Sequence, residues 1–124
     1  MPKAMVIDDS KVMCALLKRS LNKLGYEVCT AGDGKEALKI LDEQTPEVSV
    51  FLVDWNMPEV SGLEFVKRVR TIPTYAQVPL MMVTMETEIE QMQRAFEAGA
   101  NEYVMKPFTE EIITDKLRLM GVLD

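Results

Sequence analysis

Five residues with charged or hydroxyl side chains each stand at the end of a short apolar run. They are Asp8, Asp9, Asp54, Thr84 and Lys106. Three carboxylates brought within about 4 to 6 Å repel one another by a few kcal/mol, so a cluster of them needs a cation. Lysine and threonine supply the positive charge and the hydroxyl donor that suit in-line phosphoryl transfer. These residue types predict a phosphoryl-transfer site with Asp54 as the nucleophile.

The residues that accompany the carboxylates indicate which cation they bind. The chain contains no histidine, which excludes imidazole general bases and histidine-dependent zinc sites. Cys14 and Cys29 form no C-x-x-C pair, and we interpret both as small buried residues. Two free thiols are typical of a protein in a reducing compartment. Oxygen ligands alone favour Mg²⁺ or Mn²⁺, and Mg²⁺ keeps positions open for waters and a phosphate.

Elements that could position these residues follow from the hydrophobic pattern. Apolar runs predict strands at 4–7, 27–30, 48–53, 78–83 and 102–105. Segments of helical period follow each run; in the first, Val12, Leu16 and Leu21 mark the apolar face. Such alternation predicts an α/β fold, a doubly wound, flavodoxin-like parallel sheet with strand order 2-1-3-4-5 and five helices. The carboxyl ends of parallel strands share one edge, so the five polar residues should converge there.

Composition limits the partners and the location. The 124 residues suit one domain, expected to span 1–124 without an output domain. A formal charge of −6 disfavours direct DNA binding. No apolar run approaches the about 20 residues of a membrane span, and the acidic N-terminal segment is unlike a signal peptide. We expect a cytoplasmic protein without membrane insertion.

Four motifs together resemble the receiver domain of bacterial two-component response regulators, most closely the stand-alone CheY type. They are VIDDS at 6–10, VDWNMPEVSG at 53–62, VT at 83–84 and YVMKPF at 103–108. The resemblance covers essentially the whole chain and includes the order of strands and helices.

The resemblance implies a role for each residue of the site. Asp54 would be the phosphoacceptor, Asp9 a direct Mg²⁺ ligand, and Asp8 a ligand acting largely through water. The Asn56 backbone carbonyl would complete the metal shell. Thr84 and Lys106 would contact the phosphoryl group. On phosphorylation Thr84 would move inward, and Tyr103 would follow from an exposed to a buried rotamer.

Neighbouring residues would adjust this chemistry. In the family, the positions of Asn56 and Glu86 influence hydrolysis of the acyl phosphate, and this pair predicts quick self-dephosphorylation. Met85 departs from the small residue usual after the threonine, and we expect it to restrict access of the phosphodonor or of water.

Three residues are expected to shape turns at the site. Pro58 shapes the loop that Gly62 ends by opening a helix. Pro107 resembles the family's cis Lys-Pro bond, which would aim Lys106 inward.

The implied function is a switch rather than an enzyme, because each turnover modifies its own side chain. The phosphodonor would be a phosphohistidine on a sensor histidine kinase or a phosphotransfer protein. The output would be a face of the fourth helix, fifth strand and fifth helix, roughly 86–98 and 101–119, acting on a downstream protein, with chemotaxis as one setting.

Other functions remain open at this stage. A phosphorelay shuttle or phosphate sink would have the same site, and a scaffold that no longer takes phosphate would keep the fold. A phosphohydrolase of the haloacid dehalogenase type expects a second aspartate at position 56, where this chain has Asn56. A flavin-binding module is disfavoured because Asp8 and Asp9 would repel its phosphate.

Overall fold

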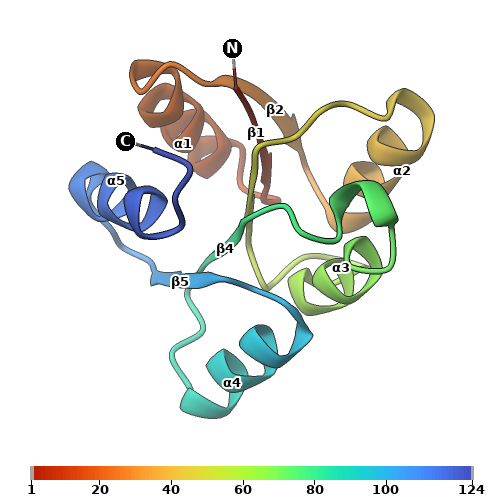
Figure 1. The fold of residues 1–124 in the computed structure, drawn as a ribbon. Helices are drawn as coiled ribbons and strands as arrows, with labels where there is room; N and C mark the ends of the chain where they lie inside the picture. The colour runs from red at the N-terminus through yellow and green to blue at the C-terminus, as the bar shows by residue number, and fades with distance from the viewer. Residues whose placement is uncertain (1, 124) are drawn as a thin grey trace.

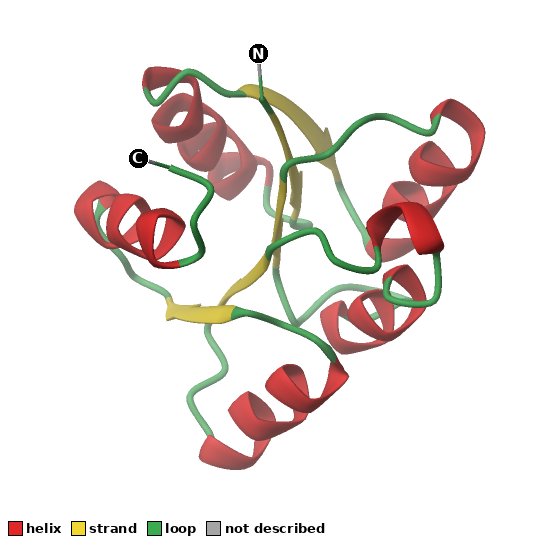
Figure 2. Ribbon diagram, in the orientation of Figure 1, coloured by secondary structure: helices red, strands yellow, loops and turns green. Residues whose placement is uncertain are grey.

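The computed structural model describes residues 2–123, which form a parallel sheet with helices on both faces (Figures 1 and 2). The strands are β1 (Lys3–Ile7), β2 (Glu27–Ala31), β3 (Val50–Val53), β4 (Leu80–Thr84) and β5 (Glu102–Met105). The helices are α1 (Lys11–Lys23), α2 (Gly34–Gln44), α3 (Gly62–Val69), α4 (Ile89–Ala98) and α5 (Glu110–Leu119), with a 3₁₀ turn, η1 (Pro73–Tyr75). The described strands lie in the order β2-β1-β3-β4-β5, so the predicted fold is confirmed.

The strands divide the core into two layers because alternate side chains point to opposite faces of a sheet. Met5 of β1 and Phe51 of β3 pack with residues of α2, α3 and α4. Val6 and Leu52, their neighbours in the chain, pack with residues of α1 and α5 on the other face. Burial on both faces explains why β1, β3 and β4 are almost entirely apolar.

Polar caps start four of the helices close to the carboxyl edge of the sheet. The side chains of Ser10, Asp33, Ser61 and Thr109 each accept a hydrogen bond from the backbone N–H three residues later. Such caps satisfy amides that have no partner within the helix. The chain therefore turns sharply from strand to helix, which leaves the strand-end side chains accessible at this edge.

The predicted inner face of α1 was right at Leu21 but wrong at Val12 and Leu16. Val12 and Leu16 are exposed, whereas Leu17 and Leu21 are buried against the sheet. The residues from Val12 to Leu17 are all apolar, so spacing alone did not identify the buried stripe. Two strands also begin later than expected: β3 at Val50 and β4 at Leu80.

Candidate functional site

The three predicted carboxylates lie together at the carboxyl edge. Ile7 of β1 is in register with Val53 of β3, so Asp8 and Asp54 leave neighbouring strands side by side. Asp8, Asp9 and Asp54 each offer an oxygen, and these oxygens all lie within 4.8 Å of one another. Asp8 and Asp54 are buried, whereas Asp9 is exposed. Buried carboxylates at this spacing require positive charge.

Lys106 supplies that charge from the end of β5. Its Nζ lies 2.8 Å from Asp8 Oδ2 and 3.7 Å from Asp54 Oδ2. The ammonium is therefore hydrogen-bonded to Asp8 and close to Asp54, with only 12% of its side chain exposed. The Lys106–Pro107 peptide bond is cis, as the motif suggested. One cation thus faces two buried carboxylates.

The groups around Asp54 shift the pKa of its carboxyl group in opposite directions. Burial is the largest and raises the pKa of its carboxyl group; Lys106 lowers this pKa, and Asp8 raises it. Hydrogen bonds from the Thr84 hydroxyl and the Trp55 backbone also favour the carboxylate, but the pKa remains above its ordinary value. Any group that adds positive charge near Asp54, or relieves its repulsion with Asp8, would therefore stabilise the ionised form of Asp54.

Thr84 and Tyr103 are linked through the backbone of Glu86. Thr84 is fully buried, and its Oγ1 accepts a hydrogen bond of 3.3 Å from Glu86 N–H. The Tyr103 hydroxyl donates to the Glu86 carbonyl at 2.9 Å. Burial, Glu86 and Asp54 raise the pKa of Tyr103 to about 12, which keeps the hydroxyl protonated as a donor. Only 9% of Tyr103 is exposed, so it lies in a buried position in this structure.

Asn56 and Glu86 meet at the mouth of the site. Asn56 Nδ2 donates to Glu86 Oε1 at 3.2 Å, and this bond joins the loops after β3 and β4. An adjacent cavity of about 400 Å³ is lined by Asp8, Asp9, Ser10, Met13, Asp54, Asn56, Met85 and Lys106. Met85 is 71% exposed, so it stands at the rim of this cavity. The cavity gives a small anionic group a route to Asp54.

The loop from Pro58 to Gly62 fixes the position of Asp54. Gly62 N–H donates to the Trp55 carbonyl at 2.8 Å, so the start of α3 lies against the turn after β3. A Cβ at Gly62 would stand 2.1 Å from the Asp54 carbonyl oxygen. Within the loop, Val60 N–H donates to the Pro58 carbonyl, and Glu59 adopts a left-handed φ of 61°. Gly62 is thus required by close backbone contact.

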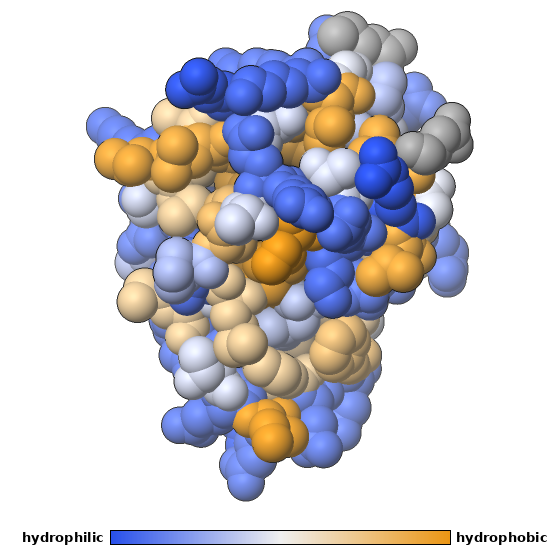
Figure 3. Space-filling view, turned by 90° about the vertical axis from the view of Figure 1, so that its left-hand side faces the viewer, coloured by the Kyte–Doolittle hydropathy of each residue, from blue (hydrophilic) through white to orange (hydrophobic). Residues whose placement is uncertain are grey.

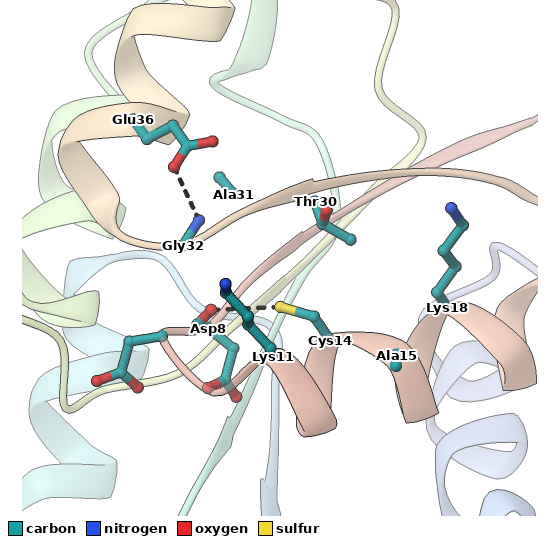
Figure 4. Close-up of a pocket in the computed structure, with 10 residues that line it drawn as sticks. Asp8, Lys11, Cys14, Ala15, Lys18, Thr30, Ala31, Gly32 and Glu36 are labelled. Carbon is teal, nitrogen blue, oxygen red and sulfur yellow. Dashed lines mark hydrogen bonds between the residues drawn. The ribbon is translucent and has the colours of Figure 1, made fainter.

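A second cavity, of about 450 Å³, lies on the other side of Asp8 and Asp9 (Figure 4). It is bounded by α1 and by the loop between β2 and α2, where Gly32 N–H donates to Glu36 Oε2. Asp54, Thr84 and Lys106 do not line it. The smaller cavity beside Asp54 is therefore the one suited to phosphoryl chemistry.

Sequence reasoning missed two neighbours of the site. Met13, an apolar residue of α1, also lines the cavity beside Asp54. Cys14, only partly buried, donates its thiol to the Asp8 carbonyl at 3.2 Å, and burial followed by the charge of Asp8 raises the pKa of that thiol. Because the predicted helix begins just after Asp8 and Asp9, the sequence could place Met13 and Cys14 near the carboxylates. Which side of α1 faces the carboxylates was not predictable, so the two could not be told apart from core residues.

The donor set fits a hard divalent cation. It consists of carboxylate oxygens beside the Asn56 loop, and the adjacent cavity leaves room for water.

None of the helices within residues 2–123 has both the length and the hydrophobicity that a membrane span needs.

Comparisons with known proteins agree with this geometry. Residues 4–118 match the model of the response regulator receiver domain. The chain is 40% identical over 119 residues to chemotaxis protein CheY1 of Helicobacter pylori, covering 95% of each chain.

Solved structures show the same likeness. Chemotaxis protein CheY4 of Vibrio cholerae has a TM-score of 0.90 and 38% identity, covering 97% of this chain and 98% of that one. Response regulator TrrA from Thermotoga maritima, in complex with Mg²⁺–BeF, has a TM-score of 0.84 and 29% identity, covering 97% and 99%. The chain belongs to the response regulator receiver family and is a CheY-like receiver domain, a phosphoacceptor switch with chemotaxis regulators among its homologues.

Proposed function

We propose that this chain stores a signal as an acyl phosphate on Asp54, received from a phosphohistidine of a histidine kinase or of a phosphotransfer protein. The observation that best supports this role is the sharing of Lys106 between Asp8 and Asp54 beside a cavity open to solvent. Residues 2–123 act as one receiver domain that passes its signal to a partner. Relatives named as chemotaxis proteins make a chemotaxis pathway the first setting to test.

The proposed transfer begins with the ionised Asp54. One carboxylate oxygen attacks the phosphorus, the P–N bond to the imidazole breaks, and the electron pair returns to the imidazole nitrogen. Lys106 remains beside the new acyl phosphate and pairs with its oxygens, because the transferred group brings about 1.5 to 2 negative charges. The Thr84 hydroxyl, at the end of the neighbouring strand β4, donates to another of these oxygens.

Mg²⁺ is the proposed cofactor, with Mn²⁺ as a substitute, held by Asp8, Asp9, Asp54 and the Asn56 backbone carbonyl. When bound, it supplies the positive charge that the carboxylate cluster lacks and neutralises charge on the transferred group. The oxygen-only donor set and the complex of Thermotoga maritima TrrA with Mg²⁺–BeF support this assignment.

Asn56, Glu86 and Met85 are the proposed rate-setting residues. The Asn56–Glu86 hydrogen bond crosses the mouth of the site, so it fixes two polar groups near the path of attacking water. Met85 occupies the rim of the same cavity. Replacing Met85 with alanine should therefore raise the rate of phosphorylation or of hydrolysis; unchanged rates would contradict the steric role.

The signal is proposed to leave through Glu86 and Tyr103. Thr84 lowers the pKa of the Asp54 carboxyl group and accepts a hydrogen bond from the Glu86 amide, and the Glu86 carbonyl accepts one from Tyr103. Movement of Thr84 toward the phosphoryl group would thus shift the loop that holds the tyrosine ring. The proposed output face consists of residues 86–98 and 101–119, on α4, β5 and α5, and it binds the downstream protein.

Intact-mass measurement after incubation with acetyl phosphate tests this proposal. A gain of one phosphate that requires Mg²⁺ and is absent from Asp54→Asn is the expected result. If neither the wild-type protein nor Met85→Ala gains a phosphate, phosphoacceptance is contradicted and a scaffold that no longer takes phosphate is favoured. A phosphorelay shuttle would instead return the phosphate to a histidine on a second protein, which radiolabelled transfer would detect.

A further inference from the structure

The second cavity, between α1 and the loop after β2, has the size of a small-molecule site. Its volume of about 450 Å³ lies within the range of about 300 to 1,000 Å³ that is typical of such sites. Asp54, Thr84 and Lys106 do not line it, so the phosphoryl transfer proposed above makes no use of it. The residues that do line it therefore indicate what else this protein binds.

One side of α1 forms a wall of this cavity. Lys11, Cys14, Ala15 and Lys18 line it and stand three or four residues apart, so they share one side of the helix (Figure 4). The two residues in the middle have short side chains, whereas the lysines at the two ends have long ones. This wall thus has a largely apolar centre with a cation at each end.

The opposite wall is also formed by small residues. Thr30 and Ala31 end β2, Gly32 follows them, and all three lie across the cavity from α1 (Figure 4). Gly32 N–H already donates to Glu36 Oε2 at 3.2 Å, so the exposed Thr30 hydroxyl is the donor that this wall offers to a ligand. Small side chains on both walls leave room for an apolar group between them.

The two lysines of the cavity have no carboxylate partner. No carboxylate oxygen of residues 2–123 lies within 4.0 Å of Lys11 Nζ or Lys18 Nζ, whereas Lys23, further along α1, pairs with Glu110. Helix α1 contains four basic residues and no acidic one, although the formal charge of the chain is −6. Figure 3 views the side of the molecule on which α1 and α5 lie, where blue hydrophilic side chains stand among orange ones. Two unpaired cations beside one cavity favour an anionic ligand.

Negative charge is concentrated at the other end of the cavity. Asp8, Asp9 and Glu36 line it, and Figure 4 shows Asp8 and Glu36 on the side away from Lys18. These carboxylates repel an anion, so an anionic group is directed toward Lys18. Asp8 and Asp9 also line the cavity beside the phosphoacceptor. The charge of a ligand in the second cavity therefore acts on carboxylates of the phosphorylation site.

We infer that the second cavity binds a phosphate monoester with a small apolar body. Such a phosphate carries about 1.5 to 2 negative charges at neutral pH, which matches two ammonium groups better than the single charge of a carboxylate. The Thr30 hydroxyl would donate to a phosphate oxygen, and the apolar body would cover Cys14 and Ala15. By reciprocal linkage, the bound anion would strengthen the binding of a cation at Asp8 and Asp9, which couples the ligand to the phosphorylation site.

Amide NMR spectra of the protein in EDTA, titrated with phenyl phosphate, test this inference. The amides of Cys14, Ala15, Thr30 and Gly32 should shift, with a dissociation constant of about 1 mM for so small a ligand. The absence of saturable shifts would overturn the inference. Shifts centred on Asn56 would place the probe beside the phosphoacceptor instead and would also overturn it.

Matched probes identify the chemistry that the cavity recognises. Benzyl alcohol is neutral and benzylamine is cationic, and both should bind about tenfold more weakly than phenyl phosphate. Benzoate, with one charge, and inorganic phosphate, without the ring, should each bind about threefold more weakly. Equal binding of benzoate would assign the cavity to carboxylates, and equal binding of inorganic phosphate would exclude a role for the apolar body. Either result would overturn the inference, as would equal binding of benzyl alcohol.

Paired variants locate the site. Lys18→Gln should weaken the binding of phenyl phosphate about fivefold, whereas Lys39→Gln, at an exposed position of α2 outside the cavity, should leave it unchanged. Ala15→Leu should fill the cavity and abolish binding, whereas Asn22→Leu, at an exposed position of the same helix, should not. Urea unfolding checks that each variant is folded. Equal effects within either pair would mean non-specific attraction and would overturn the inference.

Asp9→Asn measures the coupling between the two cavities. Loss of this negative charge should strengthen the binding of phenyl phosphate about twofold in EDTA at low ionic strength, while Glu43→Gln, at an exposed position of α2, should not change it. Unchanged binding in Asp9→Asn would show that the second cavity does not act on the phosphorylation site and would overturn the inference. None of these measurements requires a phosphate on Asp54, so their outcome is independent of the proposed function.

Discussion

The two edges of the sheet each hold a cation that is largely surrounded by protein, but the two cations have different surroundings. At the amino edge, the Arg70 guanidinium donates to the carbonyls of Gly99, Tyr75 and Val78 and to Asn101 Oδ1, at 2.7 to 3.1 Å. At the carboxyl edge, Lys106 donates to Asp8 at 2.8 Å and lies 3.7 Å from Asp54.

The two cations differ in whether their neighbours carry negative charge. Within residues 2–123, Arg70 pairs with no carboxylate; it donates to backbone groups in the loops before β4 and β5. Lys106 has one positive charge for three neighbouring carboxylates, so its environment changes whenever a metal ion or phosphate arrives. We therefore expect substitutions at the amino edge to change only the stability of the fold, whereas substitutions at the carboxyl edge change both stability and phosphoryl chemistry.

Arg70→Met gives the largest expected loss of stability. The substitution retains an apolar stem but removes five hydrogen bonds and leaves three carbonyls without this donor. We expect the free energy of unfolding, measured with urea, to fall by about 4 kcal/mol, while Asp54 still takes phosphate. Arg68→Met, which removes only an exposed bond to Glu64, is the control and should cost under about 0.5 kcal/mol.

Gly62→Ala should damage both stability and chemistry, because Gly62 contacts the backbone of Asp54. The added Cβ would lie 2.1 Å from the Asp54 carbonyl oxygen, and that oxygen cannot move without moving the phosphoacceptor. We expect a loss of about 3 kcal/mol in urea unfolding together with slower phosphorylation by acetyl phosphate. Gly32→Ala meets only Glu36 Oε2, at an ordinary 3.5 Å, and should be close to neutral. Normal phosphorylation in Gly62→Ala would show that the turn tolerates displacement.

Lys106→Met should cost about 2 kcal/mol in EDTA, because Asp8 and Asp54 lose their cation while remaining buried. Millimolar Mg²⁺ should restore most of this loss, since it supplies positive charge to the same carboxylates. The measurement is urea unfolding of the variant with EDTA and with Mg²⁺. Mg²⁺ should leave the deficit of Arg70→Met unchanged; equal rescue of both variants would remove the distinction between the two edges.

Asp54→Asn should stabilise the protein by about 1 kcal/mol at neutral pH in EDTA, because it removes a buried like charge beside Asp8. The pKa of Asp54 is raised in the folded protein, so this residue favours folding below its ordinary pKa and loses that contribution as pH rises through the raised value. The difference between Asp54→Asn and wild type should therefore shrink as pH falls. A difference that grows on acidification would contradict the raised pKa.

The carboxyl-edge residues were predictable because the parallel sheet itself brings strand ends together. Asp8, Asp54, Thr84 and Lys106 each end or follow a strand, and topology alone determines their common edge. The Arg70 contacts were not predictable in the same way. They join the end of α3 to loops 5 to 31 residues further along the chain, and no spacing rule links an arginine to carbonyls.

Side-chain orientation was the other property that the sequence left open. Leu16 and Leu17 are adjacent leucines on α1, yet only Leu17 is buried, because the sheet determines which stripe of an apolar helix packs inward. The Asn56–Glu86 hydrogen bond likewise depends on how two loops approach. In both cases the residues were visible but their contacts required the tertiary structure.

The contrast between the two edges is tested most directly by measuring how much Mg²⁺ and beryllium fluoride raise the free energy of unfolding of wild type, Arg70→Met and Asp54→Asn. A ligand that binds only the folded state raises the free energy of unfolding according to its concentration and affinity. We predict the same increment in wild type and Arg70→Met, despite their different starting stabilities, and no beryllium fluoride increment in Asp54→Asn. An increment that disappears in Arg70→Met would contradict a purely structural role of the amino edge, and one that persists in Asp54→Asn would contradict the assignment of phosphoryl chemistry to the carboxyl edge.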